Sequence, residues 1–159
     1  GTLTTQTYDW FSDGETLRSV PEFDDDRAIV VGSTPTNVAH IELLQLQDAV
    51  REAGASDVTT VIPYLGYARQ DQAFKAGQPI SVRAMAKAIS TGTDRVVLVN
   101  PHEPAVADFF TVPTESVDAT AALADPLDGL SDPLFVAPDE GATSLARATR
   151  DAYGAGDVL

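Results

Sequence analysis

The chain contains no cysteine, only two lysines and no long apolar run. Without cysteine it can form neither a disulfide framework nor a thiolate metal site, which fits a cytoplasmic protein. No stretch approaches the ~20 apolar residues of a membrane-spanning helix. No signal peptide is recognisable, although the chain does not begin with methionine. The sequence therefore predicts a globular domain with no membrane span.

Positive charge is scarce as well. The chain carries 24 Asp and Glu residues against 10 Lys and Arg residues, a formal net charge of −14. Such a charge repels phosphate backbones and anionic membranes, so neither is expected as a partner. Hydrophobic residues make up 43% of the chain, which argues against disorder. Many carboxylates with almost no lysine are typical of proteins from salt-loving archaea, and an acidic protein of an ordinary organism is the alternative.

A regular alternation of strands and helices runs through the sequence. Apolar runs typical of buried strands lie at 28–32, 58–63, 95–99 and 134–137, and helical patterns lie at 38–53, 81–90 and 140–153. This order predicts the α/β class, with a parallel sheet flanked by helices. Two arms around the turn 12–15 predict a small hairpin near the N-terminus. In the helices, Ser81 is the expected N-cap, and the expected inward residues are Met85, Ala88, Ile89, Leu145, Ala148 and Ala152.

The stretch from 61 to 90 is the strongest candidate for a site. Directly after a predicted strand it places Arg69, Gln70, Asp71 and Lys75 in one short loop. Ligands of open α/β sheets bind outside the carboxyl ends of the strands, so this crowding of polar residues favours a binding site. The alternative is an ordinary connection between a strand and a helix, with solvated charges.

Three further segments carry residues suited to chemistry. Phe11 stands beside Asp13 and Glu15, where a ring could stack on a base and carboxylates could accept from amino groups. His102 and Asp139 follow two other predicted strands, and they suit phosphate or metal contacts. Each has a simpler alternative: a surface turn for the first group, a solvated turn for His102 and a helix cap for Asp139. No Walker-A, GxSxG or HExxH motif is present.

The motif YARQDQAFKAGQPIS, together with FSDGE, NPHEPAVADFF and APDEGA, resembles the ribose-phosphate pyrophosphokinases, or phosphoribosyl pyrophosphate synthetases. The resemblance runs from about residue 8 to 154 and implies a phosphoribosyltransferase-like (type I) fold. It implies Mg²⁺-dependent transfer of diphosphate from ATP to ribose 5-phosphate, with release of AMP. The ATP contacts that it implies are Phe11, Asp13, Glu15, Arg69, Gln70 and His102, with His102 also catalytic.

The same resemblance implies that His102 and Asp139 contact Mg²⁺, and that the adenine site is shared across subunits of a homo-oligomer. Asn100 stands where the family has aspartate. Residues 1–159 are therefore expected to form the ATP-binding N-terminal domain, without the family's first strand and helix and without its second domain. This truncated chain alone is then expected to be inactive. The alternatives are a non-catalytic, nucleotide-binding regulatory relative and a structural module with no ligand.

Overall fold

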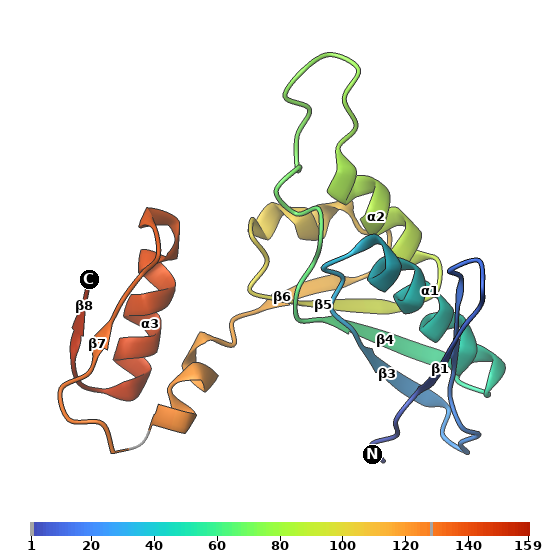
Figure 1. The fold of residues 1–159 in the computed structure, drawn as a ribbon, viewed down its shortest axis with the longest axis horizontal. Coiled ribbons are helices and arrows are strands. Elements are labelled where there is room, and N and C mark those ends of the chain that lie inside the picture. The colour runs from blue at the N-terminus through green and yellow to red at the C-terminus, as the bar shows by residue number, and fades with distance from the viewer. Residues whose placement is uncertain (1, 128) are drawn as a thin grey trace. The chain divides into compact units, whose positions relative to one another are not determined.

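The computed structural model describes residues 2–127 and 129–159. The chain divides into two compact units, unit 1 (Gly1–Val117) and unit 2 (Asp118–Leu159). Figure 1 shows the sheet of unit 1 with its helices, and the short strands and helix of unit 2. None of the helices in the described residues has the length and apolar character needed to cross a bilayer.

Unit 1 is built on a four-stranded parallel sheet in the order β3-β4-β5-β6. The strands are β3 (Arg27–Val31), β4 (Asp57–Ile62), β5 (Arg95–Val99) and β6 (Thr114–Val117). The first three match the predicted strands, and the α/β prediction of a parallel sheet with flanking helices is confirmed. Strand β6 was not predicted, because its TESV residues are mostly polar and largely exposed at the edge of the sheet.

Two helices of unit 1 follow β3 and β4. Helix α1 (Asn37–Glu52) begins where the Thr36 side chain accepts from the backbone N–H of Ala39, and Gly54, at φ 117°, follows its end. Helix α2 (Ser81–Ser90) has the predicted bounds. Its cap differs from the prediction, because Ile80 is the N-cap and the Ser81 hydroxyl instead donates to Gln70 Oε1 at 3.2 Å.

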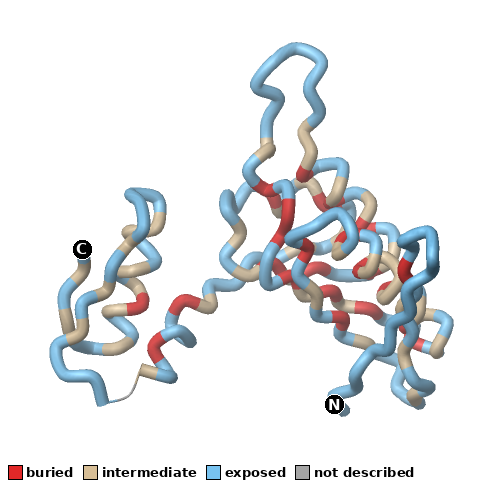
Figure 2. The backbone as a smooth tube through the Cα atoms, in the orientation of Figure 1, coloured by how far each residue is buried: buried red, intermediate tan, exposed pale blue. Residues whose placement is uncertain are grey.

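The core of unit 1 lies between the two helices and one face of the sheet (Figure 2). Its fully buried side chains come from β4, β5 and both helices, and include Val58, Ile62, Val96, Leu98, Leu43, Val82 and Ile89. Of the predicted inner face of α2, only Ile89 is fully buried, since Val82 and Ala86 take the central positions and Met85 and Ala88 lie at the margin. On the opposite face of the sheet, Ile29 and Val31 are exposed by 71% and 63%.

The predicted N-terminal hairpin is present. Strands β1 (Thr7–Trp10) and β2 (Thr16–Ser19) pair antiparallel, and β2 packs against α1. Gln45 of α1 makes this contact twice: its Nε2 donates to Thr16 O at 2.7 Å, and its Oε1 accepts from the Arg18 N–H at 3.1 Å. The Arg18 guanidinium also pairs with Glu42. The hairpin is thus attached to α1 by directed polar contacts.

Unit 2 is a small parallel pair of strands with one helix. Strands β7 (Leu134–Phe135) and β8 (Asp157–Val158) pair with each other, so the predicted strand at 134–137 does not belong to the four-stranded sheet. Helix α3 (Thr143–Tyr153) follows a 3-10 turn at Glu140–Ala142 and ends at Gly154. Its predicted inner face is wrong in two places. Leu145 and Ala152 are exposed, and Thr149 is the buried residue.

Candidate functional site

The loops after β3 and β4 are joined at the carboxyl edge of the unit 1 sheet. The Gly32 N–H donates to Val61 O at 3.0 Å, and the Thr34 N–H donates to Tyr64 O at 2.8 Å. Because β5 runs parallel to β4, the turn that contains His102 starts from the same edge. The structure therefore places two of the three predicted strand-end segments along one edge, where α/β proteins bind ligands.

Gly66 allows these two loops to approach each other closely. Its N–H donates to Thr34 Oγ1 at 3.0 Å. A Cβ at this position would lie 2.1 Å from Thr34 O and 2.9 Å from His40 Nε2. No side chain fits there without moving the backbone, so the turn after β4 depends on glycine.

Tyr67 completes the turn in a conformation that residues other than glycine rarely adopt. Its φ is +62°, in the left-handed region, which costs on the order of 1–3 kcal/mol and persists only where surrounding contacts hold it. Three contacts do so here. Its hydroxyl donates to Asn37 Oδ1, its ring lies 5.5 Å from that of His40, and its carbonyl accepts from the Gln70 N–H at 2.9 Å. The chain then continues into Arg69, whose side chain is exposed.

Gln70 closes the base of the loop formed by residues 71–79. Its Nε2 donates to Pro79 O at 3.3 Å, and its Oε1 accepts from the Ser81 hydroxyl. At the tip, the Lys75 N–H donates to Gln78 Oε1, and Gly77 has a φ of 81°. The side chain predicted to contact ATP therefore also fixes where this loop begins and ends.

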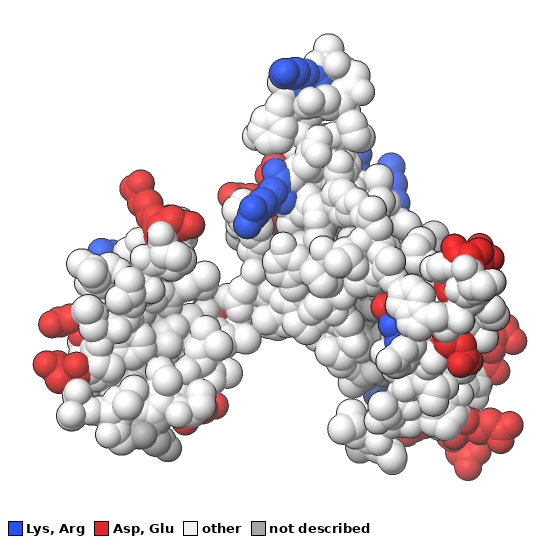
Figure 3. Space-filling model, viewed as in Figure 1, with Lys and Arg blue, Asp and Glu red and all other residues white. Residues whose placement is uncertain are grey.

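Positive charge is concentrated in the same part of the chain. Residues 69–87 contain four of the ten basic residues and a single acidic one, Asp71. On the face shown in Figure 3, basic side chains lie on and below the 71–79 loop, whereas acidic side chains gather around the hairpin. In a chain of net charge −14, this segment is a local region able to attract an anionic ligand.

The FSDGE turn connects β1 to β2, as predicted. The Phe11 N–H donates to Glu15 O at 2.9 Å, and Asp13 Oδ1 accepts from the Glu15 N–H at 3.1 Å. Phe11 is 51% exposed, and both carboxylates are exposed. The hairpin packs on α1, whereas the 71–79 loop precedes α2, so different elements of one chain carry the two groups of predicted ATP contacts (Figure 1).

His102 lies in the turn between β5 and the 3-10 helix at Pro104–Phe109. It is exposed. Two residues earlier, Asn100 ends β5 with a φ of +41°, and its N–H donates to Val117 O at 3.0 Å. Asparagine tolerates this left-handed conformation better than most residues. The backbone at Asn100 is thus sharply turned.

Asp139 lies in unit 2 and caps the short 3-10 helix there, where its Oδ1 accepts from the Ala142 N–H at 3.0 Å. The capping alternative is therefore observed, and it leaves the chemistry of a hard oxygen ligand intact. Within residues 2–127 and 129–159, no three His, Asp or Glu side chains gather into a metal-binding group. Mg²⁺ bound with nucleotides commonly takes one or two carboxylates and the substrate phosphates, so a single aspartate fits that role.

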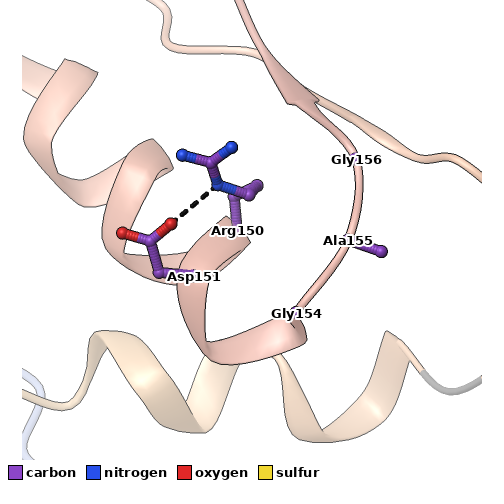
Figure 4. A pocket seen from close by; sticks show the side chains of 5 residues that line it. All are labelled: Arg150, Asp151, Gly154, Ala155 and Gly156. Atoms are coloured by element: carbon purple, nitrogen blue, oxygen red, sulfur yellow. Dashed lines mark hydrogen bonds and ion pairs between the residues drawn. The ribbon is translucent and has the colours of Figure 1, made fainter.

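A shallow depression of about 360 Å³ lies at the end of α3 in unit 2 (Figure 4). It is lined by Arg150, Asp151 and residues 154–156. The Arg150 Nε donates to Asp151 Oδ1 at 2.8 Å, so the cation there is already paired. None of the predicted site residues lines it, and we assign it no ligand.

Known proteins support the sequence resemblance. The family described as the N-terminal domain of ribose phosphate pyrophosphokinase matches residues 2–92. The chain belongs to this family. A ribose-phosphate pyrophosphokinase of Halobacterium salinarum is 62% identical over 94% of this chain and 54% of its own length. That of Methanosarcina mazei is 43% identical over 91% of this chain and 48% of its own length.

A solved structure agrees with this assignment. The phosphoribosylpyrophosphate synthetase of Mycobacterium smegmatis matches with a TM-score of 0.70 and 28% identity, over 99% of this chain and 55% of that chain. The chain thus spans about half the length of the curated relatives it matches. The residues matched to the family's N-terminal domain include the FSDGE turn and the segment 65–81 that contains Arg69, here called the Arg69 loop. His102 and Asp139 lie beyond residue 92.

Sequence reasoning missed the residues that support the Arg69 loop. Thr34, Asn37 and Gly66 fix the turn that leads to it. His40 is also part of this support. In the sequence it is only a histidine within the helical pattern at 38–53. Nothing in the local sequence indicates that these residues meet the next loop, because the contact requires β3 and β4 to be adjacent in the sheet.

Proposed function

We propose that this chain is the ATP-binding, N-terminal half of a cytoplasmic phosphoribosyl pyrophosphate synthetase. The reaction transfers the β,γ-diphosphate of ATP to the anomeric hydroxyl of ribose 5-phosphate. A bond forms between that oxygen and the β-phosphorus, the bond from the β-phosphorus to the α,β-bridging oxygen breaks, and AMP leaves. Family membership carries this proposal, and the ordered Arg69 loop at the carboxyl edge of the sheet supports it.

Arg69 and Gln70 are the proposed nucleotide contacts of unit 1. A guanidinium is always charged and offers several donors, which suits a phosphate or the face and edge of a base. The amide of Gln70 already bonds Pro79 O and the Ser81 hydroxyl, so Gln70 would contact a nucleotide while these two hydrogen bonds keep the base of the loop closed. Phe11, Asp13 and Glu15, exposed on the hairpin, are proposed to contact adenine from a neighbouring subunit of a homo-oligomer.

His102 and Asp139 complete the proposed site. We propose that His102 contacts the ATP phosphates and Mg²⁺. Asp139 of unit 2 is proposed separately as a magnesium ligand. When bound, Mg²⁺ neutralises the charge that develops on the phosphate oxygens during transfer. The protein residues orient the nucleotide and exclude alternative poses, which supplies much of the acceleration of such reactions.

The nucleotide part of the proposal is tested by titrating Mg-ATP into the chain by calorimetry in concentrated KCl. Arg69→Ala removes a charged donor, which is worth about 1.5–3 kcal/mol, so affinity should fall at least about tenfold. Arg147→Ala, an exposed arginine on α3, is the matched control and should bind as the wild type does. Equal affinity of Arg69→Ala and wild type would contradict the assignment.

A non-catalytic, nucleotide-binding relative is the second candidate, and Asn100 favours it. An asparagine in place of the family's aspartate removes a charge at the end of β5, and its left-handed backbone suits asparagine. This candidate binds ATP through the same loop but releases no AMP when ribose 5-phosphate is added. Turnover by a protein that carries Asn100 would exclude it.

A further inference from the structure

His40 is a buried ionisable group with no role in the proposed reaction. It lies on the first turns of α1, three residues after Asn37, and is 5% exposed. Its Nε2 has no hydrogen-bond partner among the described residues. A buried polar atom without a partner is costly, so its retention needs a physical reason.

The imidazole is packed against the turn that precedes Arg69. Its Nε2 lies 2.9 Å from the position that a Cβ of Gly66 would take, so the ring fills the space that the glycine leaves open. Its ring centroid lies 5.5 Å from that of Tyr67, at an interplanar angle of 48°. Asn37 and His40 share one face of the helix because they are three residues apart. Tyr67 is therefore held by a hydrogen bond at its hydroxyl and by a ring contact along its side.

From these contacts we infer that His40 is a positioning residue, whose neutral imidazole holds the strained Leu65–Tyr67 turn and thereby places Arg69 and Gln70. The inference deepens the proposed function, on which its nucleotide part rests. The left-handed backbone of Tyr67 would relax if its supports were removed. Arg69 and Gln70 follow it within three residues, so a change at Tyr67 alters where both side chains lie.

The surroundings of His40 favour the neutral form. Burial lowers the pKa of His40 below its ordinary value of 6.5. The turn after β4 presents the Tyr67 ring to it, and the loop after β3 contributes Thr34, which contacts Gly66 beside the imidazole. Charged groups of the neighbouring elements are engaged or exposed: on α1, Glu42 pairs with Arg18, and Arg69, Arg83 and Lys87 are exposed. No carboxylate in the described residues forms an ion pair with His40, so a proton there would remain uncompensated.

Nuclear magnetic resonance of the whole chain tests this directly. The chain has two histidines, so the imidazole protons of His40 can be assigned by comparison with His102→Gln. As the pH falls, the backbone amides of residues 66–69 should shift with the same midpoint as His40, while the amides of Val96 and Leu98 in the central strand stay fixed. If the chemical shifts of the turn amides do not change as His40 titrates, the inference is overturned.

Two variants test whether the pH-linked step in the turn amides comes from the imidazole of His40. His40→Gln keeps a polar, neutral side chain, and His40→Leu replaces the imidazole by an apolar side chain. Both should lose the pH-linked step in the turn amides, while His102→Gln should retain it. Persistence of the step in either His40 variant would overturn the inference. The wild-type titration needs neither His40 variant, so the test holds even if both of them fail to fold.

ATP affinity provides the functional readout. Relative to His40→Gln at the same pH, wild-type affinity for Mg-ATP should fall about tenfold as the pH drops through the midpoint of His40, a coupling of ordinary size. Taking the ratio removes the titration of ATP itself. A pH-independent ratio would overturn the link to Arg69 and Gln70. Absence of ATP binding at every pH, with the turn still responding to His40, would contradict the proposed function alone.

Discussion

Single residues at the carboxyl edge of unit 1 decide whether the candidate site can form. Gly66 and Thr34 bring two loops within hydrogen-bonding distance, and Tyr67 then turns the chain toward Arg69. These contacts are short and leave little freedom, so small changes in side-chain volume should have large effects. Arg69, by contrast, is exposed, and its replacement should change binding rather than stability.

Gly66→Ala tests the close approach of the two loops. Its methyl group would lie 2.1 Å from Thr34 O, and overpacking of this kind costs about 1–3 kcal/mol. We expect a loss of that size in the free energy of unfolding, measured with urea. Gly77→Ala is the control: its Cβ meets no atom within 4 Å and its φ is 81°, so it should cost only about 1 kcal/mol. An equal loss in both variants would contradict the account.

Asp94 provides a pH-dependent test of how β4 is anchored. Its Oδ2 accepts from the Val58 N–H at 2.7 Å and from Arg51 Nη2 at 2.6 Å. The Val58 hydrogen bond is the main cause of the lowered pKa of Asp94, Arg51 adds to it, and partial desolvation opposes both. Because the folded state favours the carboxylate, the stabilisation is present above the ordinary pKa of 3.8 and is lost as the pH falls through the lower native value.

Asp94→Ala should therefore cost about 1 kcal/mol at neutral pH, a modest value because the side chain is partly exposed. The difference from wild type should shrink as the pH falls below 3.8. Urea unfolding from neutral pH to the acid limit of the folded state measures it. Asp48→Ala, an exposed carboxylate on α1, should show no such trend. A difference that stays constant with pH would contradict the role of the charge.

At the scale of elements, α1 connects the sheet edge to the hairpin. Its first turns carry Asn37 and His40 beside the Tyr67 turn, and its middle carries Glu42 and Gln45 against the hairpin. One helix thus supports both groups of predicted ATP contacts. The hairpin has few buried residues of its own, Thr16 being one, so its position depends on these polar contacts.

Gln45→Ala should release the hairpin from α1. The change removes hydrogen bonds to Thr16 O and from the Arg18 N–H, each worth about 1 kcal/mol net. We expect amide hydrogen exchange of residues 7–19 to accelerate, while the amides of β4 keep their protection. Gln72→Ala, an exposed glutamine in the 71–79 loop, is the control. Unchanged hairpin exchange in Gln45→Ala would show that other contacts hold it.

Elements with a strong apolar pattern were predictable from the sequence, and those defined by partners were not. Strand β5 and helix α2 match their predicted bounds because runs such as RVVLV can only be buried. Strand β6 was missed because TESV has no such pattern and pairs only through its backbone with β5. Ser81 was assigned as a cap on its residue type alone, but its hydroxyl is drawn to Gln70, a long-range contact that no local pattern indicates.

The candidate site shows the same division. The segments that carry Phe11, Arg69, His102 and Asp139 were recognisable from motifs and from their place after predicted strands. The residues that support the Arg69 loop were not recognisable. Thr34, Asn37 and His40 follow β3 in the sequence, but they contact Gly66 and Tyr67, which follow β4. The face of α3 was misjudged for a related reason. In a unit as small as unit 2, which residue is buried depends on how α3 packs against the strand pair and against the 3-10 helix at Thr120–Leu123.

At the scale of the whole molecule, the acidic surface should make stability depend on salt. A net charge of −14 repels itself, and the Debye length falls from about 10 Å at 0.1 M salt to about 3 Å at 1 M. We expect the free energy of unfolding to rise over this range of KCl. Replacing the acidic turn Asp24–Asp26 by asparagines should weaken the dependence. Stability that is independent of salt would contradict an adaptation to salt.

We propose that this chain belongs to an enzyme that makes phosphoribosyl pyrophosphate. The most direct test is phosphorus nuclear magnetic resonance in concentrated KCl, with the longest reading frame that contains this sequence, Mg²⁺, ATP and ribose 5-phosphate. We expect AMP and phosphoribosyl pyrophosphate to appear together in equal amounts. A folded protein that binds ATP but yields neither product would contradict it, and Asn100→Asp would be the first variant to examine.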